Sequence, residues 1–180
     1  MDIPPSRAVT INILGGYFYR QPLPGDDPKD IKDIEFSSAP QEMTRLAGVA
    51  GQITSMAVFG KSAPDGQAYD MLYMTLQGLG DQRRLRLFLD TQAARDLVVR
   101  LPNIPPKEHI NIFVWRDKKG YDRISIKTAD GASYPSAYTK DKPGDMPSWE
   151  RTASGWDRTE LLWWMKQQIT SYNNRLIHAD

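Results

Sequence analysis

Four extended segments decide the fold of this chain: YDMLYMTLQ at residues 69–77, RRLRLFLD at 83–90, INIFVWR at 110–116 and DRISIKT at 122–128. Successive side chains of a strand point to opposite faces, so residue parity separates the two faces of each segment. One face is aliphatic throughout, as Leu72, Leu85, Ile112 and Ile124 illustrate. The alternation therefore predicts half-buried strands that share one core.

The opposite face of these segments combines aromatic rings with cations. Any base can stack on an aromatic ring, and each phosphate can meet a positive charge, so such a face suits single-stranded nucleic acid. We therefore predict a nucleic-acid-binding surface without catalytic residues. Its candidate residues are Tyr73, Arg84, Arg86, Phe88, Phe113, Trp115, Arg123 and Lys127.

The remaining elements are predicted from the spacing of apolar residues and from residues that cap helices or interrupt strands. Residues 9–14 alternate as a half-buried strand, and residues 49–61 form a long strand whose internal glycine allows a bend. Residues 92–101 have apolar positions at helical spacing after a capping Asp or Thr, and residues 154–177 do the same after Ser154. The acidic, proline-containing stretch 21–33 is predicted to be an exposed loop.

Three strands, a helix and two strands follow one another between residues 48 and 130, the order of the OB-fold. Through residues 49–59, 69–76, 84–89 and 111–115, this part resembles OB-fold single-stranded DNA-binding proteins of bacterial and phage replication. The resemblance implies a mainly β protein with a five-stranded Greek-key barrel, a helix between its third and fourth strands, an extra N-terminal strand and a C-terminal α-helix. It also implies that the sheet face and its loops bind the nucleic acid.

The predicted organisation has four parts. An N-terminal extension with a strand and an acidic loop covers residues 1–47, and the OB-fold core covers residues 48–130. A connector loop follows at residues 131–153, and the C-terminal helix covers residues 154–180. The bacterial proteins of this type end in an acidic recruiting tail, and we do not expect one here because residues 174–180 do not form an acidic run.

Composition excludes several kinds of chemistry. The chain has 180 residues, no cysteine, two histidines and a formal net charge of +1. Disulfides and thiolate metal sites are therefore excluded, and no catalytic residue, metal or cofactor is predicted. The sequence contains no membrane span or signal peptide, so we expect an intracellular, cytoplasmic protein, or one in the host cytoplasm if phage-encoded.

The predicted function is sequence-independent binding of single-stranded DNA in replication or recombination, with DNA preferred over RNA as the partner. The first alternative is an OB-fold protein-interaction module, a subunit of a larger assembly, that uses Trp156, Trp163 and Trp164 of the C-terminal helix. The second is an enzyme of nucleic acid metabolism that binds a cation through Asp26 or Asp27.

The outer aromatic residues also have a structural interpretation. Phe88, Phe113 and Trp115 could be buried beneath the C-terminal helix or the N-terminal strand, because large aromatic residues favour burial. Arginine on the same face argues against burial, since an unpaired buried guanidinium is costly. The C-terminal helix itself could pack on the core, form a homo-oligomer or bind another protein, or cover the binding face. Likewise, Tyr17–Arg20 either extends the packed region or adds a stacking surface.

Overall fold

The computed structural model describes residues 8–35, 40–148, 150–152 and 155–179. These residues form eleven strands, two α-helices and two short 3-10 helices. The strands are β1 (Val9–Leu14), β2 (Tyr17–Arg20), β3 (Ile31–Glu35), β4 (Pro40–Leu46), β5 (Val49–Ser62), β6 (Ala68–Gln77), β7 (Gln82–Phe88), β8 (His109–Arg116), β9 (Asp122–Thr128), β10 (Glu150–Thr152) and β11 (Gly155–Asp157). The helices are η1 (Pro28–Asp30), α1 (Gln92–Val98), η2 (Leu101–Asn103) and α2 (Thr159–Ile177).

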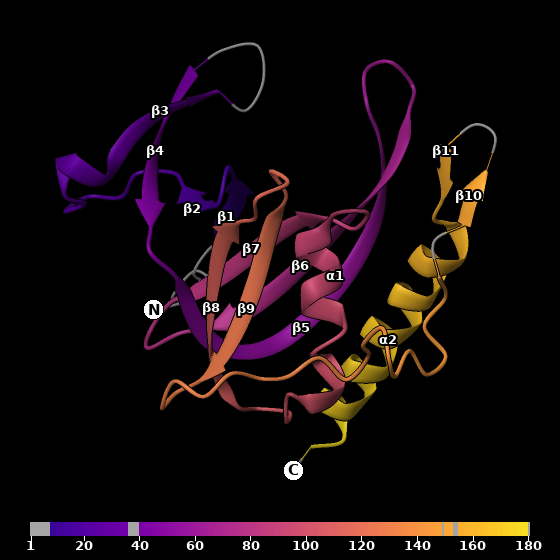
Figure 1. Cartoon of the computed structure of the whole chain (residues 1–180). Coiled ribbons are helices and arrows are strands. Elements are labelled where there is room, and N and C mark those ends of the chain that lie inside the picture. The colour runs from indigo at the N-terminus through magenta and orange to yellow at the C-terminus, as the bar shows by residue number, and fades with distance from the viewer. Residues whose placement is uncertain (1–7, 36–39, 149, 153–154, 180) are drawn as a thin grey trace.

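Nine strands form one open sheet in the order β3-β4-β2-β1-β7-β6-β5-β8-β9, and β10 pairs separately with β11 (Figure 1). Neighbouring strands are antiparallel except β1 and β7, which run parallel. The predicted mainly β OB-fold barrel is therefore wrong. The protein has a mixed α/β architecture, and its sheet is not closed.

The N-terminal strand explains why the sheet stays open. The order of three strands, a helix and two strands from β5 to β9 is as predicted. Closing these five strands would require β7 to pair with β9, because they stand at the two ends of the order β7-β6-β5-β8-β9. Instead β1 pairs with that edge of β7, from Val9 opposite Arg83 to Asn12 opposite Arg86.

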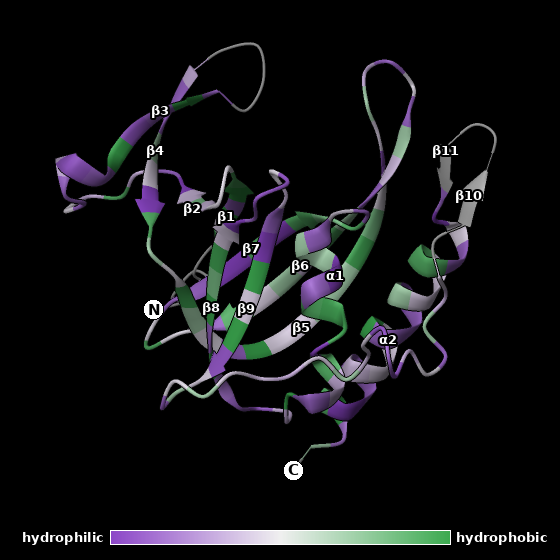
Figure 2. Cartoon of the chain, in the orientation of Figure 1, coloured by the Kyte–Doolittle hydropathy of each residue, from purple (hydrophilic) through white to green (hydrophobic). Residues whose placement is uncertain are grey.

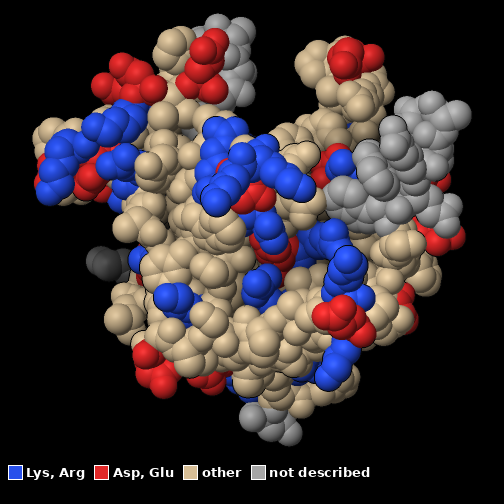
Figure 3. Space-filling view, viewed as in Figure 1, with Lys and Arg blue, Asp and Glu red and all other residues tan. Residues whose placement is uncertain are grey.

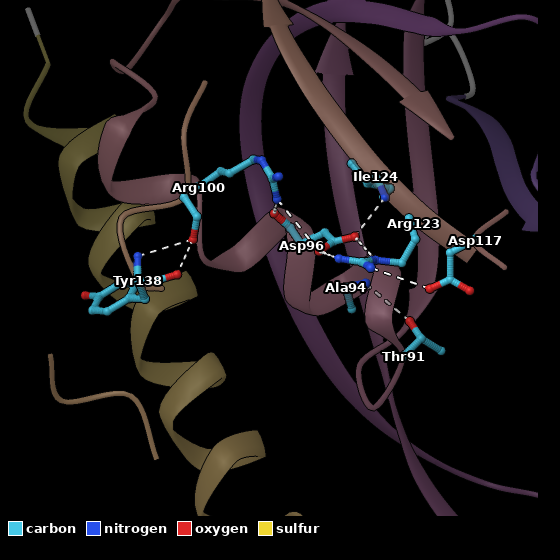
Figure 4. A network of polar contacts seen from close by, with 9 residues as sticks. Thr91, Ala94, Asp96, Arg100, Asp117, Arg123, Ile124 and Tyr138 are labelled. Atoms are coloured by element: carbon cyan, nitrogen blue, oxygen red, sulfur yellow. Dashed lines mark hydrogen bonds and ion pairs between the residues drawn. The ribbon is translucent and has the colours of Figure 1, made fainter. Parts of the chain in front are cut away.

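The two α-helices protect strand edges that pair with no other strand. Asp96 of α1 accepts a hydrogen bond from the backbone N–H of Ile124 in β9 (3.1 Å) and two from Arg123 (2.7 and 2.9 Å; Figure 4). Asn173 of α2 accepts from the N–H of Met56 (3.0 Å) and donates to its carbonyl oxygen (2.7 Å). These side chains satisfy backbone groups that would otherwise expose a sheet edge.

The core lies between the helices and the face of the sheet that carries the aliphatic residues. Hydrophobic and hydrophilic residues alternate along the strands, as predicted (Figure 2). The hydroxyl of Thr91 caps α1 by accepting a hydrogen bond from the N–H of Ala94 (3.2 Å). The buried side chains of α2 are Leu161, Trp164, Met165, Ile169 and Tyr172. The C-terminal helix therefore packs on the core, one of the three predicted alternatives.

The N-terminal part contains more regular structure than predicted. The expected loop at residues 21–33 includes η1 and the start of β3, and β4 was not predicted. Asp26 ties this part together: it accepts hydrogen bonds from Arg20 (2.6 and 2.7 Å), Thr44 (2.6 Å) and the N–H of Leu23 (2.8 Å). These bonds, that of Arg20 first, hold the pKa of Asp26 well below its usual range.

The C-terminal helix begins later than predicted. Residues 155–157 form β11, and α2 begins at Thr159, whose N–H donates to Asp157 Oδ1 (2.9 Å). Ser154, the predicted cap, lies outside the described residues. The predicted connector at 131–153 contains β10, a strand that the sequence pattern did not reveal.

Candidate nucleic-acid interface

The face of the sheet turned away from the core, here called the outer face, brings four of the predicted residues together. Tyr73 of β6 lies opposite Arg86 of β7, and Thr75 lies opposite Arg84. Phe88 follows on the same side of β7 and is 50% exposed. The regular β6–β7 register thus places two rings and two guanidinium groups side by side.

Phe59 of β5 belongs to this surface, although parity did not predict it. Its ring is 54% exposed and meets Tyr73 edge to face, with ring centroids 5.7 Å apart. Tyr69 and Phe88 form a second pair with centroids 5.3 Å apart. Aromatic pairs in such tilted contacts stabilise each other while leaving ring surface exposed.

A hollow of about 380 Å³, here called the outer hollow, runs beside these rings. Lys61 and Arg84 line it, and the side chain of neither has a hydrogen-bonding or ionic partner in the part of the chain that the structure describes. No carboxylate is among the described residues of the lining, so both positive charges are available to a ligand. Its lining residues are Ser55, Ala57, Phe59, Lys61, Tyr73, Thr75 and Arg84.

The other four predicted residues form a second group on β8 and β9. Lys127 lies over the ring of Phe113 (5.4 Å from nitrogen to centroid), and Arg123 lies over the ring of Trp115 (5.7 Å). Trp115 is 48% exposed and Phe113 is also exposed. These cation–π contacts occupy part of each ring, so a base would have to share it or displace the cation.

Not every predicted cation is free for a ligand. Arg123 is held by Asp96 at 2.7 Å and by Asp117 at 3.5 Å, and the hydrogen bond to Asp96 raises the pKa of Arg123. Arg86 donates to Asn12 Oδ1 of β1 (2.8 Å). Arg123 is therefore primarily a structural residue, whereas Arg84 is uncommitted.

β5 separates the two groups of predicted residues. Its first part, Val49 to Gln52, pairs with β8, and the part from Gln52 to Ser62 pairs with β6. Both groups lie on the side of one continuous sheet that faces away from the core.

The interpretation that the outer aromatic residues are buried is wrong for Phe88, Phe113 and Trp115, which are all exposed. In α2, Trp164 is 3% exposed and packs edge to face on Tyr138, with centroids 4.8 Å apart. Trp164 is thus a core residue, and Trp163, 63% exposed, is available to a partner. The side chain of Trp156 lies outside the described residues.

Candidate sites for cation chemistry are few. Asp26 is committed to Arg20, Thr44 and Leu23 as described above. Among the described residues, no three His, Asp or Glu side chains are grouped so that they could hold a metal ion. No described helix is both long enough and apolar enough to cross a membrane.

Comparison with protein-family models, with curated proteins and with solved structures finds no match for this chain.

Proposed function

We propose that the outer face binds single-stranded nucleic acid without sequence preference, with DNA as the ligand, in replication or recombination. The observation that supports this most is the outer hollow, where exposed rings lie beside Lys61 and Arg84, two cations without partners in the described chain. An exposed aromatic ring by itself can be explained by packing, and an exposed cation by itself can be explained by its hydration. Their combination in one hollow meets both needs of a nucleotide, a base to stack and a phosphate to neutralise.

The hollow follows β5 from Ser55 to Lys61, a length of about 20 Å at the rise of a strand. A single strand of DNA bound along the hollow would stack bases on Phe59 and Tyr73 and place phosphates near Lys61 and Arg84. Phe113 and Trp115 lie beyond the start of β5 and form a separate pair of exposed rings. No covalent bond is made or broken, so the proposal requires neither a cofactor nor a catalytic residue.

The test is fluorescence anisotropy of labelled dT and dA oligonucleotides and of the dT·dA duplex, at low and high salt. Both single strands should bind with similar affinity and the duplex more weakly, because stacking uses ring faces that a duplex keeps covered. Affinity should fall with salt by about 0.7 logarithmic units per tenfold increase for each neutralised phosphate. Equal binding of duplex and single strand, or no binding, would contradict the proposal.

Two variants separate stacking from charge. Phe59→Ala should lose about 1–3 kcal/mol of binding free energy at every salt concentration. Arg84→Gln should reduce the salt dependence by the contribution of about one phosphate. The matched controls are Tyr121→Ala and Lys32→Gln, an exposed ring and an exposed cation away from the outer hollow. Controls that weaken binding as much as the variants would mean that the outer hollow is not the site.

A protein-interaction role uses a different surface. Trp163 is the exposed tryptophan of α2 among the described residues. If oligonucleotides fail to bind, the exposed face of α2 becomes the next surface to test against a protein partner.

A further inference from the structure

A second hollow, here called the α1 groove, lies between α1 and the segment 136–148. Its volume is about 620 Å³, within the range of roughly 300–1,000 Å³ that small-molecule sites occupy. Figure 3 looks onto this face, where Lys and Arg side chains gather over α1 and β9. The charged residues of its described lining are Arg95, Asp96, Arg100, Arg123 and Lys140.

The wall of the groove opposite α1 is anchored at its start, and Met146 further along it packs against the core. The N–H of Ala137 donates to the carbonyl oxygen of Val99 (2.8 Å). The hydroxyl of Tyr138 donates to Gln168 Oε1 (3.3 Å), and its ring packs on Trp164. The groove is therefore preformed, and a ligand would not have to order this segment.

Two of the groove's cations, Arg95 and Arg123, already have interactions of their own, so the positive charge left for a ligand is that of Arg100 and Lys140. Asp96 is the single carboxylate there, and Arg123 and the N–H of Ile124 already occupy its oxygens (Figure 4). Arg100 donates to the backbone carbonyl oxygen of Asp96 (2.5 Å) and lies 3.8 Å from its carboxylate. Lys140 is exposed and has no partner among the described residues.

Arg100 is the more buried of these two cations. The side chain of Arg100 is 21% exposed, and burial lowers its pKa even though Asp96 acts in the opposite direction. A guanidinium group in such a place gains from an anion that supplies the missing charge and hydrogen bonds. Pro143, Met146 and Pro147 add an apolar wall beside these cations.

We propose that the α1 groove binds the phosphate group of a nucleotide, with Arg100 and Lys140 as its ligands. A phosphate suits the site because arginine binds it through two parallel hydrogen bonds, while lysine meets it as a point charge. The phosphate comes either from a free nucleotide or from the 5′ end of a strand. This site is distinct from the outer hollow, because the two share no lining residue.

Isothermal titration calorimetry of the full chain with dTMP and with thymidine tests the proposal. The dTMP should bind and thymidine should not, because the phosphate carries the interaction. Lys140→Gln should weaken dTMP binding by about tenfold, the loss of one charge-assisted hydrogen bond, and Arg100→Gln should weaken it at least as much because arginine supplies two. Lys142→Gln removes a neighbouring exposed lysine outside the groove lining and should leave binding unchanged.

Further arms of the experiment identify the source of the phosphate. A dT oligonucleotide with a 5′-phosphate that binds more tightly than its 5′-hydroxyl form, with the difference lost in Lys140→Gln, assigns the site to strand ends. An equal affinity of both oligonucleotides, together with dTMP binding, assigns it to free nucleotides.

Three results would overturn the proposal: no binding of dTMP, equal binding of thymidine, or tighter binding of an oligoglutamate peptide. Lys140 is exposed, so its variant should fold whatever happens to Arg100→Gln. Phe59→Ala should leave dTMP binding intact. The proposed phosphate site in the α1 groove can therefore be tested independently of the proposed DNA-binding role of the outer hollow.

Discussion

At the scale of single residues, Asp96 combines three tasks in one carboxylate. It receives the guanidinium group of Arg123, caps the free edge of β9 at Ile124 and contributes the one carboxylate of the described α1-groove lining. Its side chain is 9% exposed, so water cannot replace these bonds readily. Buried acceptors that satisfy several donors are costly to remove because each donor then lacks a partner.

Asp96→Asn should therefore lower the free energy of unfolding by about 2–3 kcal/mol, since hydrogen bonds to charged groups are among the strongest. Urea denaturation followed by circular dichroism measures the loss. Lys29→Gln, which breaks the exposed ion pair between Lys29 and Asp27, serves as the control and should change stability little. A similar loss of stability in both variants would show that the hydrogen bonds of Asp96 stabilise the protein no more than an exposed ion pair does.

At the scale of elements, one irregularity in β5 determines which residues reach the outer face. The register shifts between Ile53 and Ser55, so alternation continued from Val49 would place Phe59 toward the core. After the shift, Met56 faces the core and Phe59 faces outward beside Tyr73. A bulge of one residue thus reverses the faces of the rest of the strand.

β5 also depends on a close backbone approach at Gly51. A Cβ atom there would lie 2.8 Å from the carbonyl oxygen of Gln77, so the two strands would have to separate. Gly51→Ala should destabilise the protein by about 1–3 kcal/mol, the usual range for overpacking. Gly60→Ala lies in the same strand, where the nearest atom to a Cβ is 3.9 Å away, and should be tolerated. Equal urea midpoints for both variants would contradict this account.

The strands of the sheet show which features could be predicted from residue alternation in the sequence. Regular alternation correctly identified β6, β7, β8 and β9, and with them Tyr73, Arg84 and Phe88 of the outer face. It missed Phe59 because the alternation of residue types along the sequence does not reveal a β-bulge. Strands β3 and β4 were missed because they bury too few side chains to alternate. Barrel closure failed for another reason: parity says which face a residue occupies and nothing about which strand lies beside it.

At the scale of the whole molecule, α2 joins the end of the chain to the core through Tyr172. Burial raises the pKa of Tyr172 to about 12, whereas a tyrosine in an unfolded chain titrates near pH 10. Between these values the folded protein holds a proton that the unfolded chain has lost. Stability from this group is therefore complete below about pH 10 and lost as the pH rises through about 12.

The urea midpoint should fall between about pH 10 and pH 12, and Tyr172→Phe should make that fall shallower. Tyr121→Phe alters an exposed ring and provides the control. Identical pH profiles for the native chain and Tyr172→Phe would show that the packing of α2 does not depend on this proton.

The parallel pairing of β1 with β7 also sets an order of events in folding. Asn12 and Arg86, which meet across this pair, are 74 residues apart in the chain. A ribosome releases β1 and its hairpin partner β2 long before β7 exists, so β1 must wait for its second neighbour. The strands from β5 to β9 can form hairpins meanwhile, because their contacts are mostly local. The N-terminal strands can therefore join the rest of the sheet only after β7 has been made.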